Sequence, residues 1–199
     1  MRIIMNLLPL LKSASGLRRV VTILAGTKEG SIDPNDLPGA NVSFAKQRGH
    51  CTSLMTLTLE QIAKNAPGVS FIHSFPGLVV TDLGKNEFGA ALTALMAVYK
   101  VIGPLVSTPI EEVGKRHLYL CTSGRFPAPD AAGVPLGKGQ AVATPTQGEG
   151  AAGVYSTDSR QDGGGKGWRE ALSKLRAQDM GEKVMAWQLE EFKRITTKQ

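Results

Sequence analysis

The sequence predicts an α/β fold built on a parallel β-sheet, and three stretches lead to that prediction. Residues 19–25 (RVVTILA) form a continuous apolar run rich in β-branched residues, which is typical of a strand buried on both faces. Residues 50–65 carry apolar side chains at helical spacing, and a second short strand, 69–73, follows Gly68. Strand, helix and strand with short connections form a parallel crossover, which is almost always right-handed.

Length and composition are those of a soluble globular domain. The chain has 199 residues, of which 42% are hydrophobic and 20% charged, enough for a substantial core. Its formal net charge of +6 is dispersed rather than gathered in a basic run with aromatic residues, so we expect no nucleic-acid partner. Cys51 and Cys121 lie far apart without zinc-ligand spacing, and no secretory signal is evident. These features predict free thiols and a cytoplasmic location.

The chain divides into three parts. Residues 1–123 hold both predicted strands and their helices, beginning with an apolar helix over 1–12. Residues 124–167 are rich in Gly, Pro, Ser and Thr and are expected to be irregular, apart from a short strand near 153–156. Residues 168–199 are predicted to form two amphipathic helices. Their expected buried positions are Leu172, Leu175, Val184, Trp187 and Phe192.

Between the second strand and the irregular part, two further helices are predicted. Residues 88–106 are nearly all apolar and approach the length of a membrane span. Lys100 and several Gly and Pro residues interrupt them, so a membrane span is not expected. We interpret the segment as a buried helix, with a lid or interfacial helix as the alternative. The next helix begins at Thr108-Pro109 and runs to about Cys121, because Thr is a favourable N-cap and Pro a favourable first residue.

The most promising ligand site lies in residues 68–83 (GVSFIHSFPGLVVTDL). The strand in this stretch breaks at Pro76-Gly77, and Thr81 follows. In open α/β sheets, ligands bind just beyond the carboxyl ends of the strands. The sequence therefore predicts a bound molecule at this break. We interpret His73, within the strand, as a core or pocket-edge residue rather than as a ligand.

Other chemistry-bearing pairs have structural interpretations. His50 and Cys51 are adjacent, but a Cys–His nucleophile needs spatial adjacency and a third orienting group, so we expect a small apolar Cys beside a partly exposed His. The GGGKG run at 163–167 fails as a phosphate-binding loop, because no strand precedes it and no Ser or Thr follows its Lys.

Taken in order, the helix ending LLPLLK, the strand RVVTILAG, the helix HCTSLMTLTLEQIAK and the strand before FPGLVVT resemble the carboxyl-terminal half of the short-chain dehydrogenase/reductase family. The resemblance covers residues 1–122 and is greatest to divergent members from fungal secondary-metabolite gene clusters. It implies a partial Rossmann-like, doubly wound parallel sheet that lacks the amino-terminal nucleotide-binding strands. The segment GVYS, at 153–156, is similar to the last strand of the family.

The resemblance also implies an activity and a cofactor site. Family members exchange a hydride between NADP or NAD and a carbonyl or alcohol, here on an apolar small-molecule substrate. Their PGxxxT segment contacts the nicotinamide end of the cofactor. Its counterpart predicts contacts from Pro76, Gly77, Val79 and Thr81. The usual dimer of the family would pack the helices at 1–12 and 50–65, so a homodimer is implied.

The catalytic positions depart from the family pattern. The Ser, Tyr and Lys positions fall on Ala25, His50 and Leu54. Leu54 can neither lower the pKa of a neighbouring acid nor hold the nicotinamide ribose, whereas His50 could still donate or accept a proton. The Gly-rich fingerprint of the family also has no counterpart here.

Two functions therefore stay open. One is an NAD(P)-dependent oxidoreductase with His50 as its acid/base. The other is a truncated or catalytically degenerate relative that acts as a cofactor-free binding or accessory protein. A truncated gene model, a fragment completed by a partner and a decayed pseudoenzyme are the three origins that we consider.

Overall fold

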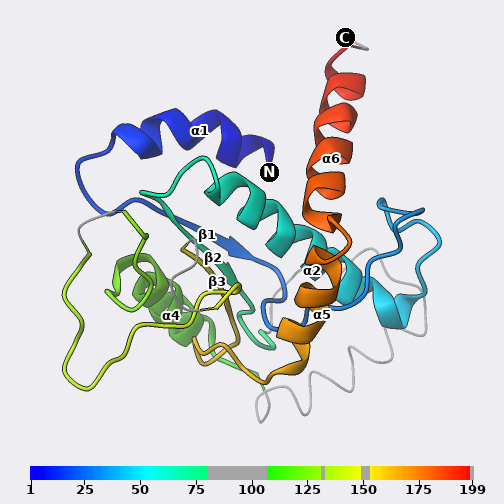
Figure 1. Ribbon diagram of the computed structural model, residues 1–199. Helices are drawn as coiled ribbons and strands as arrows, with labels where there is room; N and C mark the ends of the chain where they lie inside the picture. Colours follow the sequence, from blue (N-terminus) through cyan, green and yellow to red (C-terminus); the bar gives the residue numbers. More distant parts are fainter. Residues whose placement is uncertain (80–106, 131–132, 149–152, 198–199) are drawn as a thin grey trace.

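The chain folds around a parallel β-sheet with helices on both faces (Figure 1). The computed structural model describes residues 1–79, 107–130, 133–148 and 153–197. Within these ranges the sheet has three strands, which are β1 (Arg19–Ile23), β2 (Ser70–Ser74) and β3 (Val154–Thr157). They lie in the order β1-β2-β3, and both neighbouring pairs are parallel. The predicted α/β class and its parallel crossover are confirmed.

The central strand and β3 are buried throughout. All five residues of β2 and all four of β3 are buried, and β2 pairs with a strand on each side. β1 was expected to be buried on both faces, and that prediction is wrong. It is only half-buried, and Ile23 at its end is 58% exposed. In the described part of the chain β1 pairs only with β2, so one edge of this apolar strand lacks a neighbour.

Two helices cover one face of the sheet, and the second of them connects β1 to β2. Helix α1 spans Arg2–Ser13 and contains Pro9, and none of its residues is fully buried. Helix α2 spans Phe44–Ala63 and begins six residues before the predicted start. The extra turns lie over a polar segment that has no apolar periodicity, so the hydrophobic pattern could not reveal them.

The two faces of the sheet hold separate apolar clusters. Phe71 and Ile72 point to opposite faces of β2, because successive side chains of a strand alternate. Phe71 packs with Leu59 and Ile62 of α2, and with half-buried side chains of α1. Ile72 packs with Leu120 and other residues of the opposite layer. The sheet is thus covered on both faces, as a doubly wound arrangement requires.

Helix α4 (Ile110–Thr122) covers the second face, close to its predicted bounds. Its carboxyl end is held by Arg19 of β1. The guanidinium of Arg19 donates to the carbonyl oxygens of Leu120 (2.8 Å), Ser123 (2.9 Å) and Phe126 (2.6 Å). A cation at this end also offsets the negative end of the helix dipole. One side chain therefore fixes α4 to the sheet.

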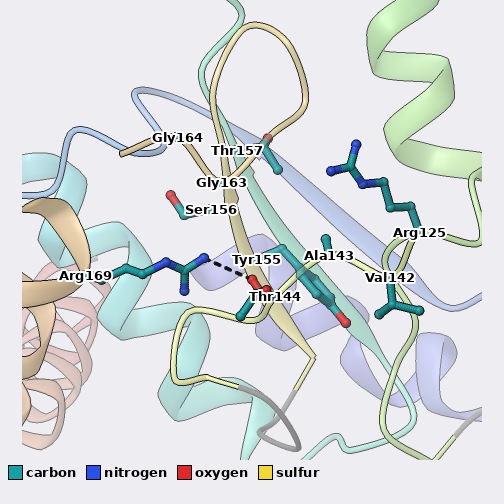
Figure 2. Close-up of a pocket in the computed structure, with 10 residues that line it drawn as sticks. All are labelled: Arg125, Val142, Ala143, Thr144, Tyr155, Ser156, Thr157, Gly163, Gly164 and Arg169. Carbon is teal, nitrogen blue, oxygen red and sulfur yellow. Dashed lines mark hydrogen bonds between the residues drawn. The ribbon is translucent and has the colours of Figure 1, made fainter. Parts of the chain in front are cut away.

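The short strand β3 lies at the edge of the sheet opposite β1, within one residue of the predicted position. The irregular segments on either side of it fold back over its outer edge. They enclose a cavity whose lining includes Arg125 and Arg169 (Figure 2).

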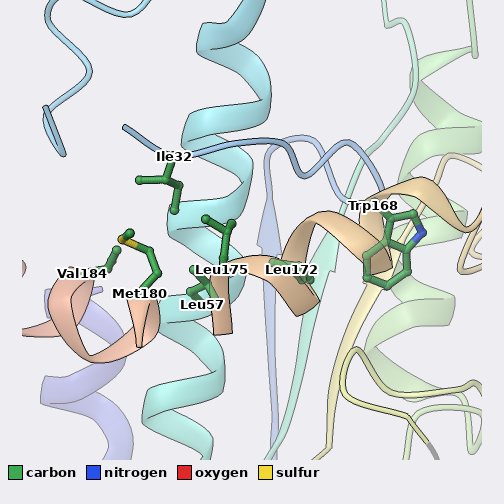
Figure 3. Packing of buried hydrophobic residues seen from close by; sticks show 7 residues of the cluster. All are labelled: Ile32, Leu57, Trp168, Leu172, Leu175, Met180 and Val184. Atoms are coloured by element: carbon green, nitrogen blue, oxygen red, sulfur yellow. The ribbon is translucent and has the colours of Figure 1, made fainter. Parts of the chain in front are cut away.

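Helices α5 (Gly167–Arg176) and α6 (Met180–Thr196) close the chain as two helices, as predicted. They pack on α2 through an apolar cluster whose members are Ile32, Leu57, Trp168, Leu172, Leu175, Met180 and Val184 (Figure 3). Leu172, Leu175 and Val184 are buried as expected, whereas Trp187 and Phe192 are only half-buried. Figure 1 shows the second half of α6 running beyond the sheet toward the C-terminus.

Two predictions fall on residues that the structure does not describe: Thr81, and the helix over 88–106 with its alternative as a lid. Both cysteines are free thiols, as expected. Among the described helices, none is both long enough and apolar enough to cross a membrane.

Candidate active site

The carboxyl ends of the three strands meet at one edge of the sheet, where the sequence predicts a ligand. The backbone N–H of Leu24 donates to the carbonyl of Ser74 (2.9 Å), and that of Phe75 donates to the carbonyl of Thr157 (2.9 Å). Gly26 lies directly over β2 and β3, and a Cβ there would collide with the carbonyl oxygens of His73 and Thr157. The loop after β1 is therefore pressed against this edge, and only glycine fits at its closest point.

The Pro76-Gly77 turn leaves the end of β2, as the sequence predicts. Gly77 has a φ of +89°, and a Cβ there would lie 3.0 Å from the Cβ of Ser159. Pro76, Gly77 and Val79 are half-buried. The backbone of this turn is thus partly open at the end of the central strand. Thr81, the fourth predicted contact, lies outside the described residues.

A buried polar cluster supports this edge from beneath. His73 of β2 is 0% exposed, and its Nδ1 lies 2.8 Å from the Oγ1 of Thr56 on α2. That hydroxyl also donates to Oε1 of Glu29 (2.7 Å), in the loop after β1. Ser156 of β3 donates to the same oxygen (2.6 Å). The cluster therefore joins the loop, the helix and two of the strands.

The hydrogen bonds determine which nitrogen of His73 carries the proton. Its Nε2 lies 3.3 Å from the backbone nitrogen of Ala25, which can only donate. Nε2 must therefore accept, and Nδ1 must donate to Thr56. Burial lowers the pKa of His73 to about 4, which agrees with a neutral ring. The interpretation of His73 as a satisfied core histidine is confirmed.

Glu29 is the one acid in this cluster. Its carboxyl group is buried, and burial raises its pKa, although hydrogen bonds from Ser156 and Thr56 oppose the shift. Its second oxygen, Oε2, has no hydrogen-bond partner in the described structure. The group is thus poised to hold a proton more readily than an exposed glutamate.

His50 lies elsewhere, against the loop after Glu29. It was expected to be partly exposed, but its exposure is 0%. Its Nδ1 accepts from the N–H of Asp33 (3.4 Å), and its Nε2 faces the carbonyl of Leu37 (3.0 Å). Both nitrogens are occupied by backbone groups, and neither of these hydrogen bonds reaches the Pro76-Gly77 turn.

The other two positions that correspond to catalytic residues are apolar and partly or fully buried. Ala25 is 6% exposed at the end of β1 and holds the Nε2 of His73 through its N–H. Leu54 is half-buried and packs against the cluster around Trp168. Neither side chain offers a group that could exchange a proton.

Two charged residues near this edge, Glu29 and Arg48, were not predicted from the sequence. The guanidinium of Arg48, an exposed residue of α2, lies 4.8 Å from the ring centroid of Phe75, next to the turn. No carboxylate of the described ranges forms an ion pair with it. A charged pair in the loop that follows an apolar strand, as in GTKEG, is the signal that could have revealed Glu29.

Comparisons with known proteins agree with the resemblance found in the sequence. No family model matches the chain. Oxidoreductase AN1596 of Emericella nidulans is 37% identical over 168 residues, which are 81% of this chain and 50% of that protein. The chain resembles short-chain dehydrogenases/reductases. The protein that carries this name, Short-chain dehydrogenase/reductase SAT2 of Stachybotrys chartarum, is 30% identical over 81% of this chain and 47% of its own length.

A third relative bears the name NmrA-like family domain-containing oxidoreductase notO, from Aspergillus sp. It is 32% identical over 63% of this chain and 36% of its own length. The chain thus spans about half the length, or less, of these relatives. Such coverage is consistent with the predicted resemblance to one half of the family fold.

Proposed function

We propose that the protein is an NAD(P)-linked oxidoreductase that acts on a carbonyl or alcohol group of a small apolar molecule in fungal secondary metabolism. The single observation that carries the proposal is the Pro76-Gly77 turn, whose backbone is partly open at the carboxyl end of the central strand. The names of the relatives as oxidoreductases support it.

The residues at this edge suit the nicotinamide end of a dinucleotide. The backbone of Pro76, Gly77 and Val79 can approach the carboxamide, because glycine adds no side chain at the turn. We include Thr81 as a further contact through its hydroxyl. Arg48 adds a cation without a carboxylate partner in the described ranges, and it suits a phosphate group. When bound, the cofactor would supply or accept the hydride.

His50 is our proposed acid/base, and its surroundings define what that role requires. The imidazole would have to give up its contact with the carbonyl of Leu37 before it could reach a substrate. A role in proton transfer therefore predicts that the loop over residues 31–39 opens during turnover. His50→Ala should then abolish turnover of a carbonyl substrate, whereas unchanged turnover would remove His50 from the mechanism.

A second function is favoured by one specific observation. Ala25 and Leu54 hold two of the positions that correspond to catalytic residues, and His50 at the third is fully buried. A protein that binds an apolar molecule without a cofactor, or that assists another enzyme, needs none of these groups. This alternative predicts a folded chain that binds neither NADPH nor NADH.

Calorimetric titration of the purified chain with NADPH and with NADH separates the two functions. Saturable binding, at a Kd of roughly 1 mM or tighter, is expected for the oxidoreductase. Gly77→Ala should abolish this binding, because the turn has a positive φ and a Cβ there would press against the Cβ of Ser159 at 3.0 Å. Gly114→Ala is the matched control, since a Cβ there meets open space. Failure of the folded wild-type chain to bind would favour the cofactor-free alternative.

The predicted homodimer is a further proposal. Ile3, Leu7 and Leu10 of α1 are 75%, 47% and 67% exposed, which supports an apolar contact through that helix. α2 is less available, because α6 packs along it. Sedimentation velocity should give a dimer for the wild-type chain and a monomer for Leu10→Glu. A wild-type monomer would contradict the proposal.

A further inference from the structure

The cavity on the outer edge of β3 is separate from the turn at the end of β2. It has a volume of about 250 Å³. Figure 2 shows Arg169 on one side of it and Arg125 on the other, with the end of β3 between them. Gly163 and Gly164 line a third side, so the chain contributes backbone rather than side chains there. Two guanidinium groups facing one small cavity make its surroundings strongly positive.

Arg169 is held in place without a carboxylate. Its guanidinium donates to the carbonyl oxygens of Pro145 (2.8 Å) and Thr144 (3.3 Å) and lies 4.3 Å from the ring centroid of Trp168. No ion pair of Arg169 occurs among the described residues. Neutral carbonyl groups orient the fork but leave its charge unbalanced, and N–H groups remain available. The positive end of helix α5, which starts at Gly167, adds to this field.

The charges around Arg169 do not cancel its own. Glu29 contributes a Coulombic attraction to Arg169, but burial raises the pKa of Glu29 and favours its neutral form. Arg176, the other charged group that acts on Arg169, is a cation and is paired with Glu60 (2.7 Å). Partial burial of Arg169 without a counterion has an electrostatic cost, which a bound anion would relieve.

Arg125 differs because it already has a partial counterion. It pairs with Asp162, whose side chain is 56% exposed and which directly precedes the lining residue Gly163 in sequence. A mostly exposed carboxylate can be displaced at small cost, because surface ion pairs contribute little to stability. Asp162 thus pairs with Arg125 in the way that an incoming carboxylate or phosphate group would.

We propose that this cavity binds a small oxyanion, a carboxylate or phosphate group, between Arg125 and Arg169. Both groups match the planar fork of a guanidinium, which can donate two parallel hydrogen bonds to them. The volume suits a small acid or phosphate rather than a whole dinucleotide. The site does not depend on the proposed oxidoreductase activity, because it lies on the outer side of β3 and shares no residue with the Pro76-Gly77 turn.

Two-dimensional NMR of the ¹⁵N-labelled chain tests the proposal directly. Inorganic phosphate and malonate are titrated separately at constant ionic strength, with chloride as the balancing anion. We expect saturable shifts in the amides of Thr144, Gly163 and Gly164 with at least one of the two anions. The anion that gives the lower Kd identifies the source as phosphate or carboxylate. Shifts that rise linearly without saturation, or that are spread over the whole surface, would overturn the proposal.

A charge-matched pair of variants distinguishes a defined anion site from nonspecific electrostatic attraction to a basic protein. Arg169→Gln should raise the Kd for the anion by about ten-fold or more, because it removes the guanidinium group that has no carboxylate partner among the described residues. Arg194→Gln makes the same change of charge on α6, where Arg194 pairs with Glu191 (2.6 Å), and should leave the Kd unchanged. Equal weakening by both variants would show nonspecific attraction and reject the site.

Arg169→Lys distinguishes a loss of anion binding from a loss of folding. It keeps the charge but not the planar fork, so we expect a folded chain that still binds more weakly than wild type. Wild-type affinity in a folded Arg169→Lys variant would show that bidentate recognition plays no part. Because neither probe is a nicotinamide cofactor, this test can fail while NADPH binding succeeds, and the reverse.

Discussion

Thr56 should make a larger contribution to stability than its size suggests, because it is the centre of the buried polar cluster. Thr56→Val keeps the shape of the side chain and removes the hydroxyl. The Nδ1–H of His73 then loses its acceptor, and Oε1 of Glu29 loses one of its two hydroxyl donors. Turning the His73 ring to its other tautomer brings no relief, because Nε2 would then face the N–H of Ala25.

The magnitude follows from these two losses. A buried donor without an acceptor costs about 1–3 kcal/mol, and an ordinary intramolecular hydrogen bond contributes about 0.5–1.5 kcal/mol. Partial relaxation reduces the sum, so we expect Thr56→Val to lower the free energy of unfolding by about 2–4 kcal/mol. Set against a total of roughly 5–15 kcal/mol for a typical domain, this loss is easily measured.

Urea unfolding at neutral pH, followed by circular dichroism, is the assay, with Thr52→Val as the matched control. Thr52 is on the same helix and is equally buried, but among the described residues its hydroxyl bonds only to the carbonyl of Arg48 one turn earlier (2.7 Å). That carbonyl also lies within the hydrogen-bonding pattern of the helix, so the control should cost about 1 kcal/mol or less. Equal losses in the two variants would refute the reasoning.

Four further predictions concern pH, packing and the hydrogen bonds at the end of α4. The pKa of His73 is about 4 in the fold against 6.5 for the free side chain. The neutral ring therefore contributes about 3 kcal/mol to the free energy of unfolding above pH 6.5, and this contribution is lost as the pH falls toward 4. Glu29, whose pKa is raised, contributes stability that increases as the pH falls. The free energy of unfolding, measured by urea denaturation from pH 7 to pH 4, should therefore decrease more steeply in Glu29→Gln than in wild type. A shallower decrease would contradict this assignment. Leu172→Ala should cost about 2–5 kcal/mol in urea unfolding, while Leu118→Ala, at a 64% exposed position, should stay within about 0.5 kcal/mol; similar losses would disprove the packing in Figure 3. Arg19→Gln should lower the free energy of unfolding by about 1–3 kcal/mol, because three carbonyl groups at the end of α4 lose their donor; no loss would show that water replaces it.

Local patterns were enough to predict the elements of the fold. The β-branched run of β1, the apolar spacing of α2 and the short link to β2 each follow from neighbouring residues. The burial of β1 could not be predicted in the same way. How well a strand is covered depends on chain far away in sequence. Among the described residues β1 and β3 each pair with one strand, yet β3 is fully buried while Ile23 of β1 is exposed.

The site was predicted only in part, for a similar reason. The Pro76-Gly77 turn is a local signal at a strand end, and it lies where the sequence placed it. Glu29 meets Ser156 across 127 residues, and no spacing rule links them. His50 stands next to Cys51 in the sequence, but its environment is set by the loop that contains Asp33. Contacts of this range become visible only when the chain is folded.

The central claim is that a nicotinamide cofactor meets the turn at the end of β2. Titration of the ¹⁵N-labelled chain with NADPH, read residue by residue, tests it most directly. The account predicts saturable shifts at Gly26, Gly77 and Val79, with Gly114 on α4 unchanged. A folded chain in which these amides stay fixed at saturating NADPH, or in which only Gly163 of the cavity beside β3 shifts, would contradict it.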